Sequence, residues 1–216
     1  MVHAKNSGWC ALVANWLPGF LNGFDKTWWS RKHNTHHVMT NHLGVDPDID
    51  LMPVFFLYAP TKAFDSHLRK YQHLYALPMY SFLYVLWRAN SMSRAIAIRD
   101  YDTLIFKIIP GYIWLGCLPA IVSFGSVMVG GLLVALVVVQ SHEDEEMTEG
   151  ASQKCGFAMT QINSTSDIVC PDPVTEYLFG GMQYQLTHHL MPTLPRYKYA
   201  ALRPVVEAWC AEQGVV

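Results

Sequence analysis

The chain has 216 residues, of which 51% are hydrophobic and only 15% are charged, and its formal net charge is −2. This length suits one domain, residues 1–216, and the low charged fraction, against about 25% in a typical soluble domain, favours a membrane protein or an unusually apolar enzyme. The five cysteines include no Cys-x-x-Cys pair and no basic tract is present, which argues against a zinc ribbon, a disulfide framework and nucleic-acid binding.

The first apolar stretch, residues 6–24, is uncharged and follows Lys5. It could be mistaken for a secretory signal, but Asn15, Pro18 and Asn22 interrupt it and no small-residue cleavage pattern follows. We expect an interfacial or packed helix here.

Four histidines follow within WWSRKHNTHHVMTNH, residues 28–42. His33, His36 and His37 have the spacing i, i+3, i+4, which places them on one face of a helix. Neutral imidazole is a good ligand for iron, copper and zinc. The two tryptophans that open the segment either anchor it at a membrane interface or pack in the core.

Residues 74–87 form a run of 14 uncharged residues that contains Pro78. As a helix this run would reach only about 21 Å, which is too short to cross a bilayer. Its tyrosines and Trp87 predict a helix that lies at the membrane interface.

The run at residues 108–141 carries no charged residue and no histidine over 34 positions. With the four residues before it, of which Lys107 would reach to the interface, it allows two helices of about 19 residues, close to the thickness of a bilayer. Pro119, Ser123 and Gly125 lie where a tight turn between the two helices could fall.

We therefore predict that residues 104–141 form one transmembrane hairpin in a protein whose other helices are interfacial or cytosolic. The alternative is a soluble all-α protein that buries this run. A hairpin leaves the regions before and after it on the same side, and nearly all Lys and Arg residues fall in those regions. Because cytoplasmic loops are enriched in Lys and Arg, that side should be the cytosol.

The segment YQLTHHLMP, residues 184–192, repeats the histidine spacing with Gln185, His188 and His189. Two clusters of matching spacing on one side of a hairpin predict a metal site between facing helices. No His-Glu-x-x-His occurs, which argues against a zinc metalloprotease, and no Glu-x-x-His occurs, which argues against a carboxylate-rich di-iron bundle.

Both clusters resemble motifs of one family. Residues 28–41 resemble the second histidine box of the membrane fatty acid desaturases, and residues 180–196, GGMQYQLTHHLMPTLPR, resemble the third. Gln185 at the start of the third box is typical of the front-end branch, which inserts a double bond between an existing one and the carboxyl end. DPDID at residues 46–50 and QHLY at residues 72–75 also match this branch.

The resemblance implies an all-α integral membrane protein with a non-haem di-iron centre, held mainly by histidines at the cytosolic face. The two Fe ions would use O2 to desaturate a fatty acyl chain, carried on CoA or on a phospholipid, in unsaturated fatty acid biosynthesis. Electrons would come from cytochrome b5 and its reductase, in trans or through a fused domain, and the protein would be a multi-pass protein of the endoplasmic reticulum. The alternatives are a sphingolipid desaturase or hydroxylase and an inactive membrane metal-binding fragment.

By their positions in the boxes, the resemblance makes five histidines iron ligands, namely His33, His36, His37, His188 and His189. His142 stands where the wider superfamily has a further ligand, although Val138 replaces the asparagine often found four residues earlier. Gln185 is either a weak ligand or a hydrogen-bonding neighbour. Further residues could orient the ligands from outside, namely Asp46, Asp48, Asp50, Glu145 and His42. A capped or solvated position is the alternative for each of them.

No first histidine box of the family, His-Asp-x-x-His or His-x-x-x-His, precedes His33, and His3 is the only other histidine in that region. A cytochrome b5 domain and a first transmembrane hairpin are also absent from the sequence. We therefore expect residues 1–216 to be the C-terminal part of a desaturase that binds iron weakly and forms no product by itself.

Overall fold

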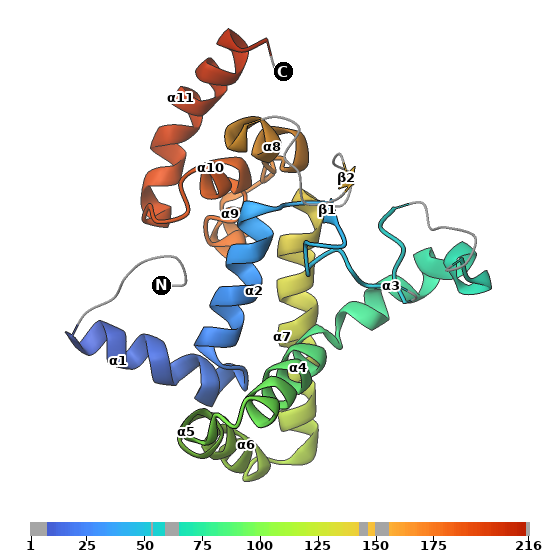
Figure 1. Cartoon of the computed structure of the whole chain (residues 1–216), viewed down its shortest axis with the longest axis vertical. Coiled ribbons are helices and arrows are strands. Elements are labelled where there is room, and N and C mark those ends of the chain that lie inside the picture. The colour runs from blue at the N-terminus through green and yellow to red at the C-terminus, as the bar shows by residue number, and fades with distance from the viewer. Residues whose placement is uncertain (1–7, 53, 59–64, 143–146, 150–155, 215–216) are drawn as a thin grey trace. The chain divides into compact units, whose positions relative to one another are not determined.

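The computed structural model describes residues 8–52, 54–58, 65–142, 147–149 and 156–214. These residues are mostly helical and fall into two compact units (Figure 1). Unit 1 comprises Met1–Asn34 and Leu51–Leu136, and unit 2 comprises Thr35–Asp50 and Val137–Val216. The predicted helical class is confirmed.

Unit 1 contains α1 (Gly8–Leu17), a π-helical turn (Pro18–Asn22), α2 (Lys26–Val38), a 3-10 helix (His67–Tyr71), α3 (Gln72–Tyr80), α4 (Leu83–Ala97), α5 (Tyr101–Thr103), a π-helical segment (Leu104–Ile108), α6 (Ile109–Gly116) and α7 (Ala120–Val138). The ends of α2 and α7 continue into unit 2. Unit 2 adds β1 (His42–Leu43), 3-10 helices (Val139–Ser141 and Arg196–Lys198), β2 (Thr148–Glu149), α8 (Phe157–Ser164), α9 (Pro173–Phe179), α10 (Gln185–Leu190) and α11 (Tyr199–Glu212). The two short strands pair in parallel, with His42 opposite Thr148.

The N-terminal apolar stretch is helical, as expected, and Ala14 is the one buried residue of α1, whereas Trp9 and Leu12 are 81% and 60% exposed. It ends at Gly23, which has a φ of 74° that favours glycine. The indole nitrogen of Trp16 donates to the carbonyl oxygen of Phe106 at 2.8 Å. A Cβ atom on Gly19 would lie 2.7 Å from Cβ of Lys107, so the absence of a side chain at Gly19 allows this close contact.

The prediction of one helix over residues 74–87 is wrong, because the segment divides between α3 and α4 at Ser81 and Phe82. Pro78 near the end of α3 has no backbone N–H to donate within the helix. In addition, α7 passes so close to the break that a Cβ on Gly131 would lie 2.6 Å from the carbonyl oxygen of Ser81. The break between α3 and α4 thus coincides with a contact from α7, a helix distant in sequence.

The helical structure of residues 104–141 is interrupted at residues 117–119, so Pro119 lies in the break between α6 and α7, whereas Ser123 and Gly125 lie inside α7. Within the described ranges, one segment, Ala120–Ser141, is long and apolar enough to cross a membrane. Only 17% of its most apolar window is buried, whereas the core helix of a soluble protein would be mostly buried. The part before the break contains the short α5, the π-helical segment and α6, and a complete two-span hairpin therefore remains a prediction.

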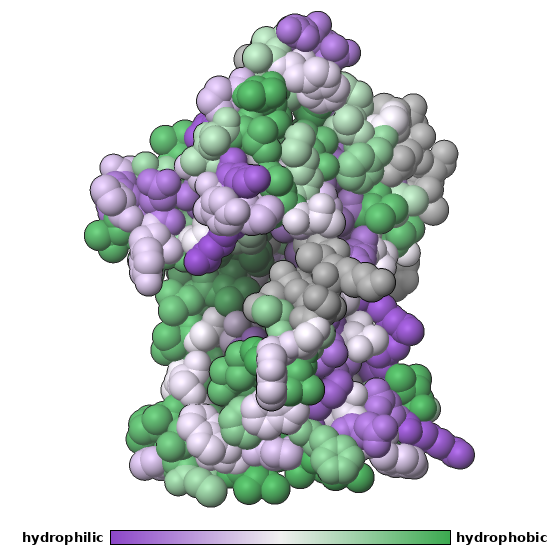
Figure 2. All heavy atoms as spheres, turned by 90° about the vertical axis from the view of Figure 1, so that its left-hand side faces the viewer, coloured by the Kyte–Doolittle hydropathy of each residue, from purple (hydrophilic) through white to green (hydrophobic). Residues whose placement is uncertain are grey.

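Large apolar side chains remain exposed on α6 and α7, among them Ile113, Ile121 and Phe124, which are 64%, 80% and 59% exposed. Figure 2 shows apolar side chains interspersed with polar ones on one face of the molecule. Exposed apolar surface of this kind marks an interaction with lipid or with another protein.

A buried carboxylate begins α2. Asp25 accepts hydrogen bonds from the backbone N–H groups of Thr27 and Trp28, at 2.8 and 3.2 Å, which satisfies donors that the first turn of a helix leaves unpaired. Its other oxygen lies 3.3 Å from Nζ of Lys107. Lys107 therefore pairs with Asp25, where we expected it to reach toward the interface.

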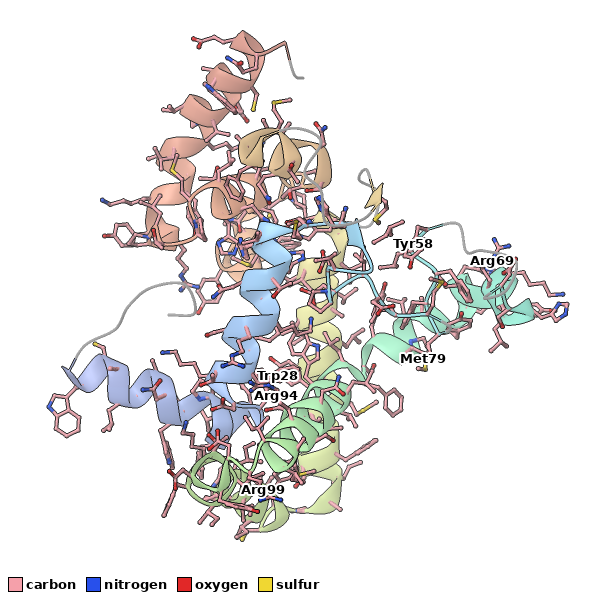
Figure 3. All side chains as sticks on the ribbon, viewed as in Figure 1. Trp28, Tyr58, Arg69, Met79, Arg94 and Arg99 are labelled. Carbon is pink, nitrogen blue, oxygen red and sulfur yellow. The ribbon has the colours of Figure 1, made fainter. Side chains whose placement is uncertain are left out.

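The first half of α2 packs in an aromatic core. Phe24, Trp28 and Trp87 are buried there, and Trp29, Leu83, Tyr84 and Val134 pack against them. Trp28 lies on α2 facing α4 (Figure 3). Of the two alternatives for the tryptophans, core packing is the one observed. This packing fixes the helix that carries the first histidine cluster.

Candidate metal centre

The end of α2 is folded back by a tight turn. Asn41 and Gly44 have positive φ values of 57° and 75°, and the turn brings Asp46 beside the helix that precedes it. Oδ2 of Asp46 lies 2.9 Å from Nδ1 of His36 and accepts the backbone N–H of Asn41 at 2.9 Å. Oδ1 accepts the backbone N–H of Asp48 at 2.9 Å. One buried carboxylate therefore holds both the turn and a histidine ring.

The second histidine cluster lies on α10, which packs against α8 and α11 in unit 2 (Figure 1). Oδ1 of Asp167 accepts the backbone N–H of Leu186 at 2.9 Å, in the first turn of α10. Four residues of this short helix, Gln185, Thr187, His188 and His189, are buried. The helix is thus held at its start and presents its histidines to the interior of unit 2.

Three buried histidines from separate segments meet in unit 2. His36 comes from α2, His142 follows α7 and its 3-10 extension, and His189 lies on α10, and one ring nitrogen of each lies within 4.8 Å of the other two. Their ring centroids are 4.8 to 5.1 Å apart. The predicted convergence of the two clusters is therefore observed for these three residues, and it includes His142.

Two further histidines complete the cluster. The ring of His37 stacks on that of His189, with centroids 4.1 Å apart and planes at 17°. The ring of His188 lies edge-on to that of His37, at 4.6 Å. Five imidazoles thus lie in contact within unit 2, and their ten ring nitrogens can form hydrogen bonds or bind a metal.

The Nδ1 atoms of four rings are held by oxygen atoms outside the cluster. Nδ1 of His36 faces Asp46, that of His142 lies 2.9 Å from the carbonyl oxygen of Ser164, that of His188 lies 3.0 Å from the hydroxyl of Tyr199, and that of His189 lies 2.8 Å from Oε1 of Gln161. Metal-ligating histidines usually donate their second nitrogen in this way, which fixes the tautomer and the orientation of the ring. The outward hydrogen bonds of these four rings thus all use Nδ1, and Nε2 is the atom through which each ring would bind a metal.

Burial keeps the rings of His142 and His189 neutral. Burial, together with the neighbouring ring of His36, lowers the pKa of His142 from 6.5 to about 3. Burial also lowers the pKa of His189 well below its usual value. Nε2 of His189 is buried and has no hydrogen-bond partner among the residues that the structure describes. A neutral, unpartnered nitrogen beside two other imidazoles fits a transition-metal ion.

Gln185 lies inside the cluster as a hydrogen-bonding neighbour of His142. Its Nε2 is 3.1 Å from Nε2 of His142, and the amide can donate to the ring because Nδ1 of His142 donates to Ser164. The amide therefore contacts the nitrogen of His142 that a metal would use. Its Oε1 has no partner within the described part of the chain.

The other candidate residues have different surroundings. His33 is one helical turn before His37, belongs to unit 1 and stacks on Trp29 at 5.2 Å. Asp48 lies 3.6 Å from His36, close enough to support Asp46, whereas the side chain of Asp50 is exposed. His42 is fully buried, with Nδ1 3.0 Å from the carbonyl oxygen of Thr40 in its own turn. Glu145 lies outside the described residues.

Several residues of the site have no counterpart in the sequence analysis. Gln161 and Ser164 on α8, Tyr199 on α11, and Thr40 and Asn41 after α2 contact the histidines or their neighbours. The polar pair Thr40 and Asn41 follows the first histidine cluster closely in the sequence, and this proximity could have indicated that the two residues belong to the site. α8 and α11 carry no comparable motif, because their residues reach the site only through tertiary packing.

The sequence matches the family described as fatty acid desaturase over residues 1–216. It is 33% identical to the Delta(6)-fatty-acid desaturase of Caenorhabditis elegans over 230 residues, which covers 94% of this chain and 52% of that protein. It is 30% identical to the Delta(8)-fatty-acid desaturase of Euglena gracilis, covering 98% and 56%, and 28% identical to the Delta(5) fatty acid desaturase of Caenorhabditis elegans, covering 98% and 53%. The chain spans about half the length of these curated relatives. No solved structure matches it.

Proposed function

The chain belongs to the fatty acid desaturase family, and on that premise we propose that it carries the iron centre of an oxygen-dependent front-end desaturase. The observation that carries this proposal is the buried trio of His36, His142 and His189, whose ring nitrogens lie within 4.8 Å of one another. The Delta(6), Delta(8) and Delta(5) activities in the names of the relatives favour the front-end branch.

The proposed ligands are His33, His36, His37, His142, His188 and His189. Five of them contact one another within unit 2, and His33 is added because it shares a helix face with His37. Two Fe ions are proposed because six imidazoles exceed what one ion takes from a protein while keeping open positions.

Iron bound by these residues would supply the oxidation of unactivated C–H bonds with O2. The chain itself holds the rings in place through the oxygens of Asp46, Gln161, Ser164 and Tyr199. Burial keeps His142 and His189 neutral, so no proton has to leave either ring at physiological pH before a metal binds.

The same proposal includes the partners and the location that such a reaction needs. The substrate is a fatty acyl chain bound as a CoA thioester or a phospholipid, and cytochrome b5 with its reductase supplies electrons. We propose an endoplasmic reticulum membrane protein, crossed by a hairpin over residues 104–141, with the histidines in the cytosol. The support is the mostly exposed apolar segment Ala120–Ser141 and the Lys and Arg distribution.

The test uses a chimera in which this chain replaces the aligned segment of the nematode Delta(6) desaturase. It is expressed in yeast supplied with polyunsaturated fatty acids, and the products are identified as methyl esters. We expect a new double bond on the carboxyl side of an existing one. His36→Ala and His188→Ala should abolish it, because each removes an imidazole of the centre.

His67→Ala is the matched control, because His67 is exposed on the 3-10 helix before α3. This variant should keep the activity of the unaltered chimera. Desaturation that survives both His36→Ala and His188→Ala, at unchanged protein levels in the membrane, would contradict the proposed centre.

A further inference from the structure

Gln161 contacts the nitrogen of His189 that a metal would not use. It lies on α8 with no solvent exposure, and its Oε1 is 2.8 Å from Nδ1 of His189. The same oxygen is 3.0 Å from Oγ1 of Thr40, which is itself 3.3 Å from Nδ1 of His189 and 2.7 Å from the carbonyl oxygen of His36. All of these residues lie in unit 2.

The orientation of the Gln161 amide determines the tautomer of His189. With Oε1 toward the ring, Nδ1 of His189 must carry the proton, and Nε2 keeps a lone pair. With the amide turned by half a rotation, Nε2 of Gln161 would donate to Nδ1, and the proton of His189 would have to sit on Nε2. A ring protonated at Nε2 cannot bind a metal through that atom.

Thr40 alone does not choose between these two states. Its hydroxyl has one proton, which it can donate to Oε1 of Gln161 at 3.0 Å or to the carbonyl oxygen of His36 at 2.7 Å. With Oε1 toward His189, the Nε2 atom of Gln161 is buried without a partner among the described residues. This orientation therefore leaves the Nε2 group of Gln161 without a hydrogen bond, which costs stability. Buried unsatisfied groups of this kind in native proteins often mark functional sites.

We infer that Gln161 is a positioning residue, whose carbonyl oxygen holds His189 in the tautomer that directs an unprotonated Nε2 at the metal. This inference rests on the proposed metal centre. The alternative is that Gln161 only fills space between the end of α2, α8 and α10. The two roles predict opposite orders of metal affinity for two substitutions of Gln161. Gln161→Glu keeps an acceptor and removes the donor, whereas Gln161→Met keeps the volume and removes both.

The experiment measures Co²⁺ binding to the purified full chain in detergent, by the d–d absorption of the bound ion. We expect Gln161→Met to weaken binding about 10- to 100-fold, the effect typical of losing an outer partner of a ligand. Gln161→Glu should bind at least as tightly as the unaltered chain. Gln72→Met is the matched control, because Gln72 bonds both backbone groups of Phe56 in unit 1, away from the histidines.

A filling role would give the reverse order, with Gln161→Met like the unaltered chain and Gln161→Glu weakest, because it buries a charge. That result overturns the inference. A second measurement, ¹⁵N NMR of the metal-free chain with labelled histidine, reads the tautomer of His189 directly. We expect protonation at Nδ1 in the unaltered chain, and protonation at Nε2 there would overturn the inference even if Gln161→Met does not fold. Absence of Co²⁺ binding by the unaltered chain would instead contradict the metal centre.

Discussion

Nδ1 of His36 lies 2.9 Å from Oδ2 of Asp46, and both side chains are buried. The same carboxylate accepts the backbone N–H groups of Asn41 and Asp48, so the ring is fastened to the turn that follows its helix. A carboxylate in this position holds the ring in one orientation and raises the basicity of its other nitrogen. The Asp46 carboxylate thus orients the ring of His36, which we propose as a metal ligand.

We predict that Asp46→Asn weakens metal binding by about 10- to 100-fold, because a neutral amide polarises the ring less and must give up one of the backbone contacts. A Co²⁺ titration of the purified chain measures the change. The control is Asp65→Asn, which removes an exposed i, i+4 pair with Arg69 and should leave the affinity unchanged. Equal affinities in both variants would remove Asp46 from the site.

Stability should depend on pH through the buried histidines. Burial lowers the pKa of His142 to about 3 and that of His189 well below its usual value, whereas both titrate near about 6.5 when unfolded. Below that pH the unfolded chain takes up protons that the folded chain refuses. The free energy of unfolding is therefore greatest above about pH 6.5 and falls, by up to about 1.4 kcal/mol per pH unit for each ring, as the pH drops toward 3.

Thermal unfolding of the metal-free chain, followed by circular dichroism at about pH 7.5 and about pH 5, tests this dependence. The midpoint should be lower at the acidic pH. His142→Gln should reduce the difference between the two midpoints, and His67→Gln, at an exposed position, should preserve it. A difference that is the same in all three proteins would show that His142 does not cause it.

The close packing of α7 predicts different effects on stability for alanine substitutions at two of its glycines. Gly131→Ala would place a methyl group 2.6 Å from the carbonyl oxygen of Ser81, a backbone atom, so helices must move apart at a cost of about 1–3 kcal/mol. Gly125→Ala, in the same helix, meets nothing within 4 Å and should leave stability unchanged or slightly higher. Thermal unfolding in detergent compares the two, and equal midpoints would contradict the packing of α7 against this break.

Cysteine labelling from the two sides of the membrane tests the hairpin. Single cysteines at Met92 and Ser152, in a chain whose own cysteines are replaced by serine, should react with an impermeant maleimide from the same, cytosolic side. The reason is that two crossings between these positions return the chain to its starting side. Labelling from opposite sides would mean that Ala120–Ser141 crosses alone.

Sequence analysis could predict which residues lie together only where the local geometry of one helix determines their positions. Spacing i, i+3, i+4 placed His36 and His37 on one helix face, and the same spacing applied to His188 and His189 on α10. His142 was predicted as a ligand from the family resemblance, because a single histidine forms no spacing pattern that indicates a metal site. The break at Ser81 was missed, since it coincides with the approach of Gly131 from a distant helix.

The hydrogen-bond partners of the rings lay beyond sequence analysis for a related reason. Gln161 is 28 residues from His189, and Tyr199 belongs to a helix whose pattern indicates only an amphipathic element. Such contacts are set by how α8, α10 and α11 pack. The acidic run at residues 46–50 illustrates the limit, because Asp46 is buried against His36 whereas Asp50 is exposed.

The central claim is that the buried histidines of unit 2 hold iron, and the iron content of the purified chain tests it most directly. The chain is purified from cells grown with iron, and the metal is measured by mass spectrometry per mole of protein. Because we expect the chain alone to bind iron weakly, we predict that a substoichiometric amount of iron accompanies the unaltered chain and His67→Ala and is lost from His189→Ala. That substitution removes the ring that contacts His36, His37, His142 and His188. Iron retained in His189→Ala at the level of the unaltered chain would contradict the account.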